Sequence, residues 1–201
     1  MLELVRNIVA IIRGNVLCFV FGIKHNVLIR FFPGIQITKE SQGEILMEKG
    51  VMIGRNTIIT VRNGAQLYMG KKSSLNADCK VICQKKICIG ENTIFGPNVL
   101  IYDHDHVYDA DGVKRNEFEC DNVVIGNNCW IGAGTIILKG TNIGNNCVIK
   151  NSIILNDVYI GDNAVIENCI VESRSTINPG EHLGDENELQ IINERNFRYS
   201  L

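Results

Sequence analysis

A six-residue period runs through the middle of this 201-residue chain and limits what it can fold into more than any other feature. The residues that repeat are aliphatic or aromatic, and Gly often follows them: Ile89, Phe95 and Ile101, then Ile125, Ile131, Ile137, Ile143 and Ile149. A period of six matches neither the 3.6 residues of a helix face nor the alternation of a long strand. The repeat therefore marks equivalent sides of a coil.

Each six-residue unit predicts a short strand followed by a bend, with the aliphatic residue pointing inward. Gly and Asn occupy the bends because they tolerate positive φ at low cost. Three such sides close one coil, and stacked coils place the inward residues above one another in a dry core. After Ile149 the steps alternate between five and six residues as far as Leu183, so we expect coils from about Ile53 to Leu183.

The period divides the chain into three parts. Residues 1–44 are expected to form a helical capping segment, since Leu4, Ile8 and Ile12 begin a series of apolar positions at helical spacing. Residues 45–184 are expected to form an all-β, parallel β-helix with an extruded loop at 103–122. Residues 185–201 lose the repeat and form a tail.

Composition narrows the class of protein. With 45% hydrophobic residues and a net charge of −2, the chain predicts a soluble domain without a general basic field for nucleic acid. Arg6 and Arg13 interrupt the apolar N-terminus, so no segment is expected to cross a bilayer. Eight Cys without an evident secretory signal favour reduced thiols in the cytoplasm.

The interruption of the repeat between Ile101 and Ile125 is the place to look for chemistry, because a regular prism has no concave surface. This loop opens with Asp103, His104, Asp105 and His106. A His beside a carboxylate suits general base catalysis near neutral pH. Such a cluster can also bind a metal, but no complete calcium loop or zinc motif accompanies it, so no metal site is predicted.

Residues 89–149, with the repeat, the His-bearing loop and the sequence WIGAG, resemble the hexapeptide-repeat acyltransferases, most closely the sugar O-acetyltransferases. This resemblance implies a left-handed parallel β-helix, a homotrimer, and acetyl-CoA as the acyl donor. It also implies transfer of an acetyl group to a hydroxyl of a sugar or glycan, such as a surface polysaccharide.

The resemblance also assigns residues. His104 corresponds to the catalytic base and Asn76 to an amide that helps hold the oxyanion, while Asp103 is the candidate orienting partner of His104. His106, Tyr108 and Trp130 are candidates for the acceptor site. The candidates for contacts with acetyl-CoA are Gly132, Ala133, Gly134, Lys139, Lys150 and Asn151.

The C-terminal coils depart from this family. Asp157, which follows Leu155 and Asn156, stands where related enzymes have a Lys near the nucleotide, and an Asp there repels phosphate. From Ile149 onward the chain instead resembles the C-terminal β-helix of sugar-nucleotide pyrophosphorylases, whose catalytic domain it has no room for. A noncatalytic trimeric scaffold or regulatory protein is therefore the alternative, with a metal-dependent hydrolase as a third hypothesis.

The N-terminal segment is basic, with five Lys or Arg before Glu40 and a single carboxylate at Glu3. A basic amphipathic helix can lie on an anionic membrane surface, and it can also cover an open end of a β-helix. Both interpretations stay open: residues 1–30 pack on the first coil, or they also contact the inner face of a membrane.

Overall fold

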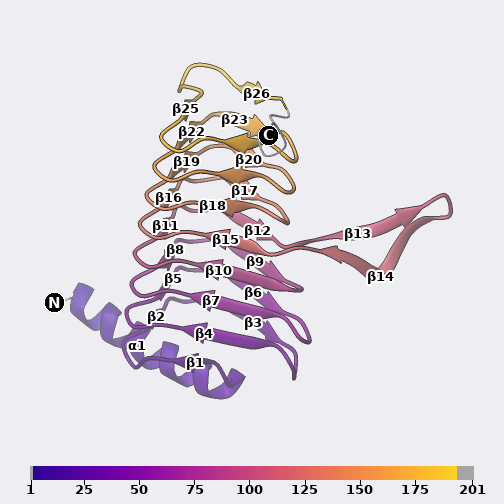
Figure 1. The fold of residues 1–201 in the computed structure, drawn as a ribbon. Helices are drawn as coiled ribbons and strands as arrows, with labels where there is room; N and C mark the ends of the chain where they lie inside the picture. Colours follow the sequence, from indigo (N-terminus) through magenta and orange to yellow (C-terminus); the bar gives the residue numbers. More distant parts are fainter. Residues whose placement is uncertain (1, 194–201) are drawn as a thin grey trace.

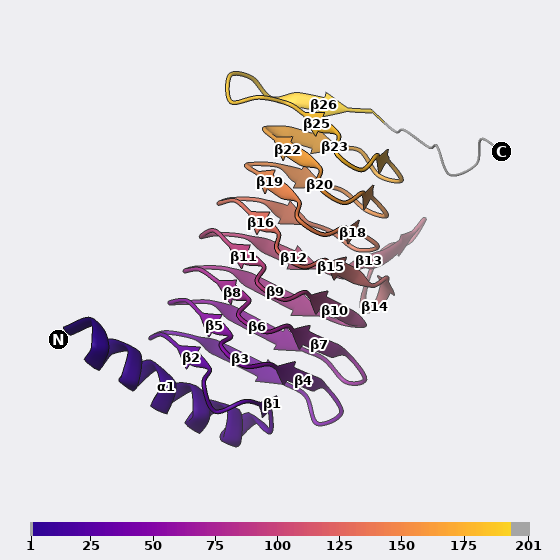
Figure 2. The same ribbon diagram turned by 60° about the vertical axis from the view of Figure 1, so that its left-hand side comes forward.

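The computed structural model describes residues 2–193 and shows one β-helix with a helix at its N-terminal end (Figure 1). Three parallel sheets of eight strands each form the sides of a prism. Each strand pairs with the equivalent strand of the next coil, so the sheets run along the axis (Figures 1 and 2). The predicted fold class, a left-handed parallel β-helix with a short helical segment, is confirmed.

The strands fall into three sheets that we call sheets A, B and C. Sheet A contains β1 (Lys24–His25), β4 (Glu44–Met47), β7 (Gln66–Met69), β10 (Lys86–Ile89), β15 (Val123–Ile125), β18 (Asn142–Ile143), β21 (Tyr159–Ile160) and β24 (Thr176–Ile177). Sheet B contains β2 (Arg30–Phe31), β5 (Met52–Ile53), β8 (Ser74–Leu75), β11 (Ile94–Phe95), β16 (Trp130–Ile131), β19 (Val148–Lys150), β22 (Val165–Glu167) and β25 (His182–Leu183). Sheet C contains β3 (Gln36–Lys39), β6 (Ile58–Val61), β9 (Lys80–Cys83), β12 (Leu100–Tyr102), β17 (Ile136–Ile137), β20 (Ile153–Ile154), β23 (Cys169–Val171) and β26 (Gln190–Ile192).

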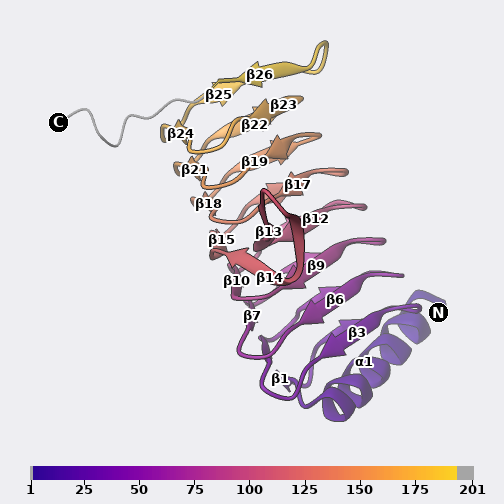
Figure 3. The same ribbon diagram turned by 90° about the vertical axis from the view of Figure 1, so that its right-hand side faces the viewer.

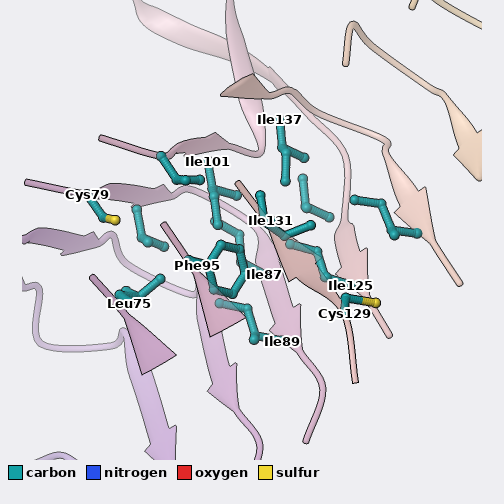
Figure 4. Close-up of a cluster of buried hydrophobic side chains, with 14 of the residues drawn as sticks. Leu75, Cys79, Ile87, Ile89, Phe95, Ile101, Ile125, Cys129, Ile131 and Ile137 are labelled. Carbon is teal, nitrogen blue, oxygen red and sulfur yellow. The ribbon is translucent and has the colours of Figure 1, made fainter. Parts of the chain in front are cut away.

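The repeated residues form the core. In sheet B, for example, Phe95 pairs with Ile131 and Ile131 with Ile149, and all three side chains are buried. Figure 4 shows the inward side chains of adjacent coils in contact. The small residues four places after the aliphatic position fill the corners. The Cys residues among them are buried free thiols: Cys79, Cys129 and Cys147.

The bends follow the predicted chemistry. Asn92, Asn128 and Asn146 have φ between 54° and 57° at equivalent corners. Gly126 serves a different purpose, because a Cβ on it would lie 2.5 Å from the carbonyl oxygen of Gly144 in the next coil. Gly at this place allows two backbones to approach closely.

The β-helix extends further than the period predicts. β1 already pairs with β4, so the coils begin at Lys24 and not near residue 45, and β26 adds a strand within the predicted tail. The offset between paired residues explains why: Lys24 pairs with Leu46, 22 residues on, whereas Ile143 pairs with Ile160, 17 residues on. Longer coils hide the six-residue period near the N-terminus.

Helix α1 (Leu2–Phe21) lies across the N-terminal end of the β-helix (Figures 1 and 2). It buries Ala10, Gly14 and Cys18 and contacts β2. By length and composition α1 is long and apolar enough to cross a membrane, because an 18-residue window of it has a mean hydropathy of 1.7, so Arg6 and Arg13 do not by themselves exclude a span. Core helices and signal sequences meet the same measure, but only 17% of this window is buried.

Candidate functional site

The extruded loop is an antiparallel hairpin that leaves the prism at the corner between sheets C and A. β13 (His104–Asp109) pairs with β14 (Gly112–Cys120), and His104 lies opposite Cys120. The turn is closed by Asp109, whose Oδ1 accepts the N–H of Asp111. Figure 1 shows the hairpin projecting away from the coils, and Figure 3 shows it from the side toward which it points, in front of the coils. Its base, beside β12 and β15, is where the polar side chains meet.

Asp103 is the most deeply buried carboxylate of this base, with no exposed surface. Its Oδ1 accepts the N–H of Gln84 at 2.7 Å, and its Oδ2 accepts the N–H of Lys85 at 2.8 Å and a weaker bond from the Cys83 thiol at 3.4 Å. Burial acts to raise the pKa of Asp103, but the hydrogen bonds from His104, the two backbone N–H groups and Cys83 outweigh it and lower the pKa. Asp103 therefore stays charged.

His104 lies directly against this carboxylate. Its Nδ1 is 3.2 Å from Asp103 Oδ1, and its side chain is 13% exposed. The ring makes edge contacts with Tyr102 and Phe118, with centroids 6.2 and 5.4 Å away. An acceptor at Nδ1 fixes the tautomer in which Nδ1 carries the proton, and this leaves Nε2 as a base. The arrangement suits proton transfer to and from a substrate hydroxyl.

A second polar cluster ties the hairpin to the coils above. Asp105 Oδ2 accepts a hydrogen bond of 2.8 Å from Asn156 Nδ2. Lys139 Nζ lies 3.7 Å from Asp105 and 3.5 Å from Glu119, and its side chain is only 14% exposed. The charge of Lys139, a predicted acetyl-CoA contact, is thus shared between two carboxylates of the hairpin.

His106 and Tyr108, the two hairpin residues predicted to meet the acceptor, differ in how many contacts hold their side chains. His106 contacts Phe118 at a centroid distance of 4.7 Å, and its Nδ1 is 3.3 Å from the carbonyl oxygen of Lys114. Tyr108 is further out and 80% exposed. His106 therefore shares the Phe118 contact with His104, whereas Tyr108 has room to meet another molecule.

The other candidates lie at a different corner, between sheets B and C. Asn76 follows β8, and its Oδ1 accepts the N–H of Ala77. A groove there is lined by Arg6, Phe32, Arg55 and Asn76 among others.

Higher along the same corner are Gly132, Ala133 and Gly134, which follow β16, and then Lys150 and Asn151. Trp130 is 45% exposed on sheet B, and Lys150 Nζ lies 5.5 Å above its ring. Lys150 also pairs with Glu167 at 2.9 Å. A Cβ on Gly132 would meet the Lys150 side chain at 3.1 Å, so the glycine lets that side chain lie close.

Within one chain, the structure brings Asp103, His104 and His106 together but leaves Asn76, the glycine turn and Lys150 at another corner. Sheet C separates the two corners, and its strand plus bend spans roughly 15 Å at about 3.3 Å per residue. The prediction that Asn76 assists His104 therefore requires the corner of a neighbouring subunit.

Sequence reasoning missed several residues that shape the base. Gln84 and Lys85 supply backbone N–H groups, and Tyr102 and Phe118 supply ring contacts. Gln84 and Lys85 could have been found by counting one coil back from Asp103, since β9 pairs with β12. No group of three or more His, Cys, Asp or Glu side chains in residues 2–193 is arranged to hold a metal ion.

Comparison with known proteins supports the resemblance. The galactoside O-acetyltransferase of Lactococcus lactis is 33% identical over 129 residues, which cover 61% of this chain and 62% of that protein. The galactoside O-acetyltransferase of Escherichia coli is 26% identical over 142 residues, which cover 69% and 65%. The chain thus spans less than two thirds of these curated relatives. The resemblance to the hexapeptide-repeat sugar O-acetyltransferases is confirmed.

A family model and a solved structure also match the chain. Residues 113–189 match the family described as the GMPPB C-terminal domain, in agreement with the second likeness of the C-terminal coils. Among solved structures, a maltose O-acetyltransferase from Clostridium difficile is 29% identical, with a TM-score of 0.46, and the match covers 76% of this chain and 68% of that one.

Proposed function

We propose that this chain forms a homotrimer that transfers an acetyl group from acetyl-CoA to a hydroxyl of a sugar or glycan, with His104 as the general base. The single observation that carries this proposal is the buried, hydrogen-bonded Asp103 against His104 Nδ1. The galactoside O-acetyltransferases among the relatives support the choice of reaction and of acceptor class.

In this reaction His104 Nε2 takes the proton of the acceptor hydroxyl as its oxygen attacks the thioester carbonyl. The tetrahedral intermediate then collapses, the C–S bond breaks, and the imidazolium returns the proton to the departing thiolate. Asp103 holds the ring and stabilises its charged form. No acyl-enzyme forms, because attack by the acceptor is direct.

The trimer accounts for the separation of the two corners. A neighbouring subunit that places its corner between sheets B and C against the hairpin would add Asn76, the turn Gly132 to Gly134 and Lys150 to His104. Backbone groups of the small-residue turn would then lie close to the pantetheine amides, and the Asn76 amide would donate to the oxyanion.

One observation favours the noncatalytic alternative. The two Lys residues predicted to meet acetyl-CoA both have carboxylate partners, Lys139 with Asp105 and Glu119, and Lys150 with Glu167. Donor phosphates would have to compete with these carboxylates. A trimeric scaffold without thioester binding is therefore the second candidate.

Calorimetric titration with CoA and acetyl-CoA separates the two candidates. Micromolar binding supports the acetyltransferase, and no binding at millimolar donor supports the scaffold. Turnover is then compared for His104→Gln and for the matched control His182→Gln, an exposed His at the far end of sheet B. We expect a loss of about 10² to 10⁴-fold only in His104→Gln, with donor affinity retained. Equal turnover in the two variants would refute the role of His104.

A further inference from the structure

One face of α1 presents large apolar side chains to solvent. Each of the following is at least 44% exposed: Val5, Ile8, Val9, Ile12, Val16, Phe19 and Val20. Val27 and Leu28, in the turn that follows β1, are 66% and 45% exposed. Singly exposed apolar residues are ordinary, but a contiguous set of this size indicates an interaction surface.

The opposite face fixes the helix so that this surface cannot turn inward. Gly14 is buried against the first coil, where a Cβ would lie 3.1 Å from the carbonyl oxygen of Ile29. Arg13 donates to the carbonyl oxygen of Phe31 at 3.2 Å, and Asn15 Nδ2 donates to that of Val27 at 3.0 Å. The helix therefore lies against the first coil (Figure 2), and the exposed apolar side chains are on the side of α1 away from its buried residues Ala10, Gly14 and Cys18.

Charge is strongly segregated along the axis. Residues 1–72 hold ten of the 20 Lys and Arg residues but only four of the 22 Asp and Glu residues. Because each coil follows the previous one along the axis, position in the sequence becomes position along the prism. The α1 end is accordingly positive, and the described coils beyond it, residues 73–193 with eight basic and 17 acidic residues, are negative.

Several of these cations share one hollow on the first three coils, which begins three residues after the end of α1. Lys24, His25, Lys49 and Lys71 line this hollow, together with Glu48. The Lys24 side chain is 73% exposed, and its ion pair with Glu44 is long at 3.9 Å. An exposed pair at this distance is weak, so the charge of Lys24 can still attract an anion.

We propose that the α1 end docks on an anionic lipid surface, with the apolar stripe in the interface and the Lys residues against the headgroups. A stripe of apolar side chains beside cations is the pattern of interfacial helices. A second copy of the chain fits less well, because stripe-to-stripe pairing would bring two positive ends together. A membrane-spanning role would require α1 to leave the coil that buries Ala10, Gly14 and Cys18.

This docking goes beyond acetyl transfer and does not depend on it, so the test measures lipid binding and not enzymatic activity. The full chain is floated with vesicles of phosphatidylcholine alone and with vesicles that also contain phosphatidylglycerol. We expect binding to the anionic vesicles only, and release in high salt. No binding to anionic vesicles, or equal binding to both kinds, would overturn the proposal, and so would retention through alkaline carbonate extraction, which indicates a membrane span.

Matched variants test the surface itself. The pair Ile12→Gln and Val16→Gln should weaken binding to anionic vesicles by about a hundredfold, since each apolar side chain contributes roughly tenfold at this depth of burial. The control pair, Leu189→Gln and Ile191→Gln, replaces equally exposed apolar residues at the opposite end and should leave binding unchanged. Equal effects of the two pairs, with unchanged thermal melting, would overturn the assignment to α1.

The role of charge is tested with Lys49→Gln and Lys71→Gln, which both line the hollow, against Lys80→Gln with Lys114→Gln further along the axis. We expect a loss of affinity of at least tenfold for the first pair and none for the second. A change in oligomer mass in the Ile12 and Val16 variant, without a change in vesicle binding, would assign the stripe to contacts between copies and overturn the proposal.

Discussion

Replacement of Asp103 by Asn should destabilise the protein and remove part of its dependence on pH. The substitution keeps the shape of the side chain but removes its charge and one of its two acceptor oxygens. In the wild-type protein both oxygens are used, by the N–H of Gln84 at 2.7 Å and the N–H of Lys85 at 2.8 Å. An amide NH₂ that faces either N–H group places two donors against each other in a site without exposed surface.

The magnitude follows from these contacts. One charge-assisted hydrogen bond is lost, worth about 1.5–3 kcal/mol, and a buried N–H group is left without an acceptor, at a cost of about 1–3 kcal/mol. We therefore expect Asp103→Asn to lower the free energy of unfolding by about 3 kcal/mol at pH 7. The control Asp121→Asn removes an exposed carboxylate paired with Lys85 at 2.9 Å and should cost less than about 1 kcal/mol.

The dependence on pH has a definite sign. The pKa of Asp103 is lowered in the folded state, so its contribution to stability is present above the unfolded pKa and is lost as pH falls through the folded pKa. The difference between wild-type protein and Asp103→Asn should therefore shrink as pH falls below about 4.

Urea denaturation at pH 7 and at a series of acidic pH values measures both effects. If Asp103→Asn and Asp121→Asn lose equal stability at pH 7, or if the effect of Asp103→Asn is independent of pH, the assignment of a charged Asp103 is refuted. The measurement does not depend on any enzymatic activity.

Three further predictions concern the coils and the hairpin. Ile131→Ala removes a fully buried rung of the sheet B ladder and should cost about 2–5 kcal/mol in urea denaturation, against less than about 1 kcal/mol for Ile94→Ala, which is 48% exposed. Gly70→Ala places a Cβ 2.7 Å from the backbone nitrogen of Glu91 and should cost about 1–3 kcal/mol; no loss of thermal stability would show that the coils can separate there. Asn156→Ala removes the bond that holds Asp105, so limited proteolysis within residues 106–118 should become faster, and an unchanged cleavage rate would contradict that anchoring role.

The core follows from the amino-acid sequence alone. The six-residue period assigns each inward position, because in stacked coils a residue such as Ile131 meets its own equivalents above and below. The interruption of the repeat located the hairpin. Asp103 and His104 are consecutive residues, so the sequence also showed that they lie close together. Longer coils near the N-terminus hid the start of the β-helix at Lys24.

Contacts between coils and the residues of the outer faces became visible only in the folded protein. The N–H groups that hold Asp103 come from the coil below, at Gln84 and Lys85, and their direction depends on the register between coils. Asn76 and His104 lie at different corners because sheet C stands between them. The number of residues between them in the sequence does not reveal this separation. The same holds for the exposed apolar face of α1. Gly14 packs against Ile29 and so fixes which face of the helix is covered, whereas helical periodicity alone does not say which of two apolar faces is buried.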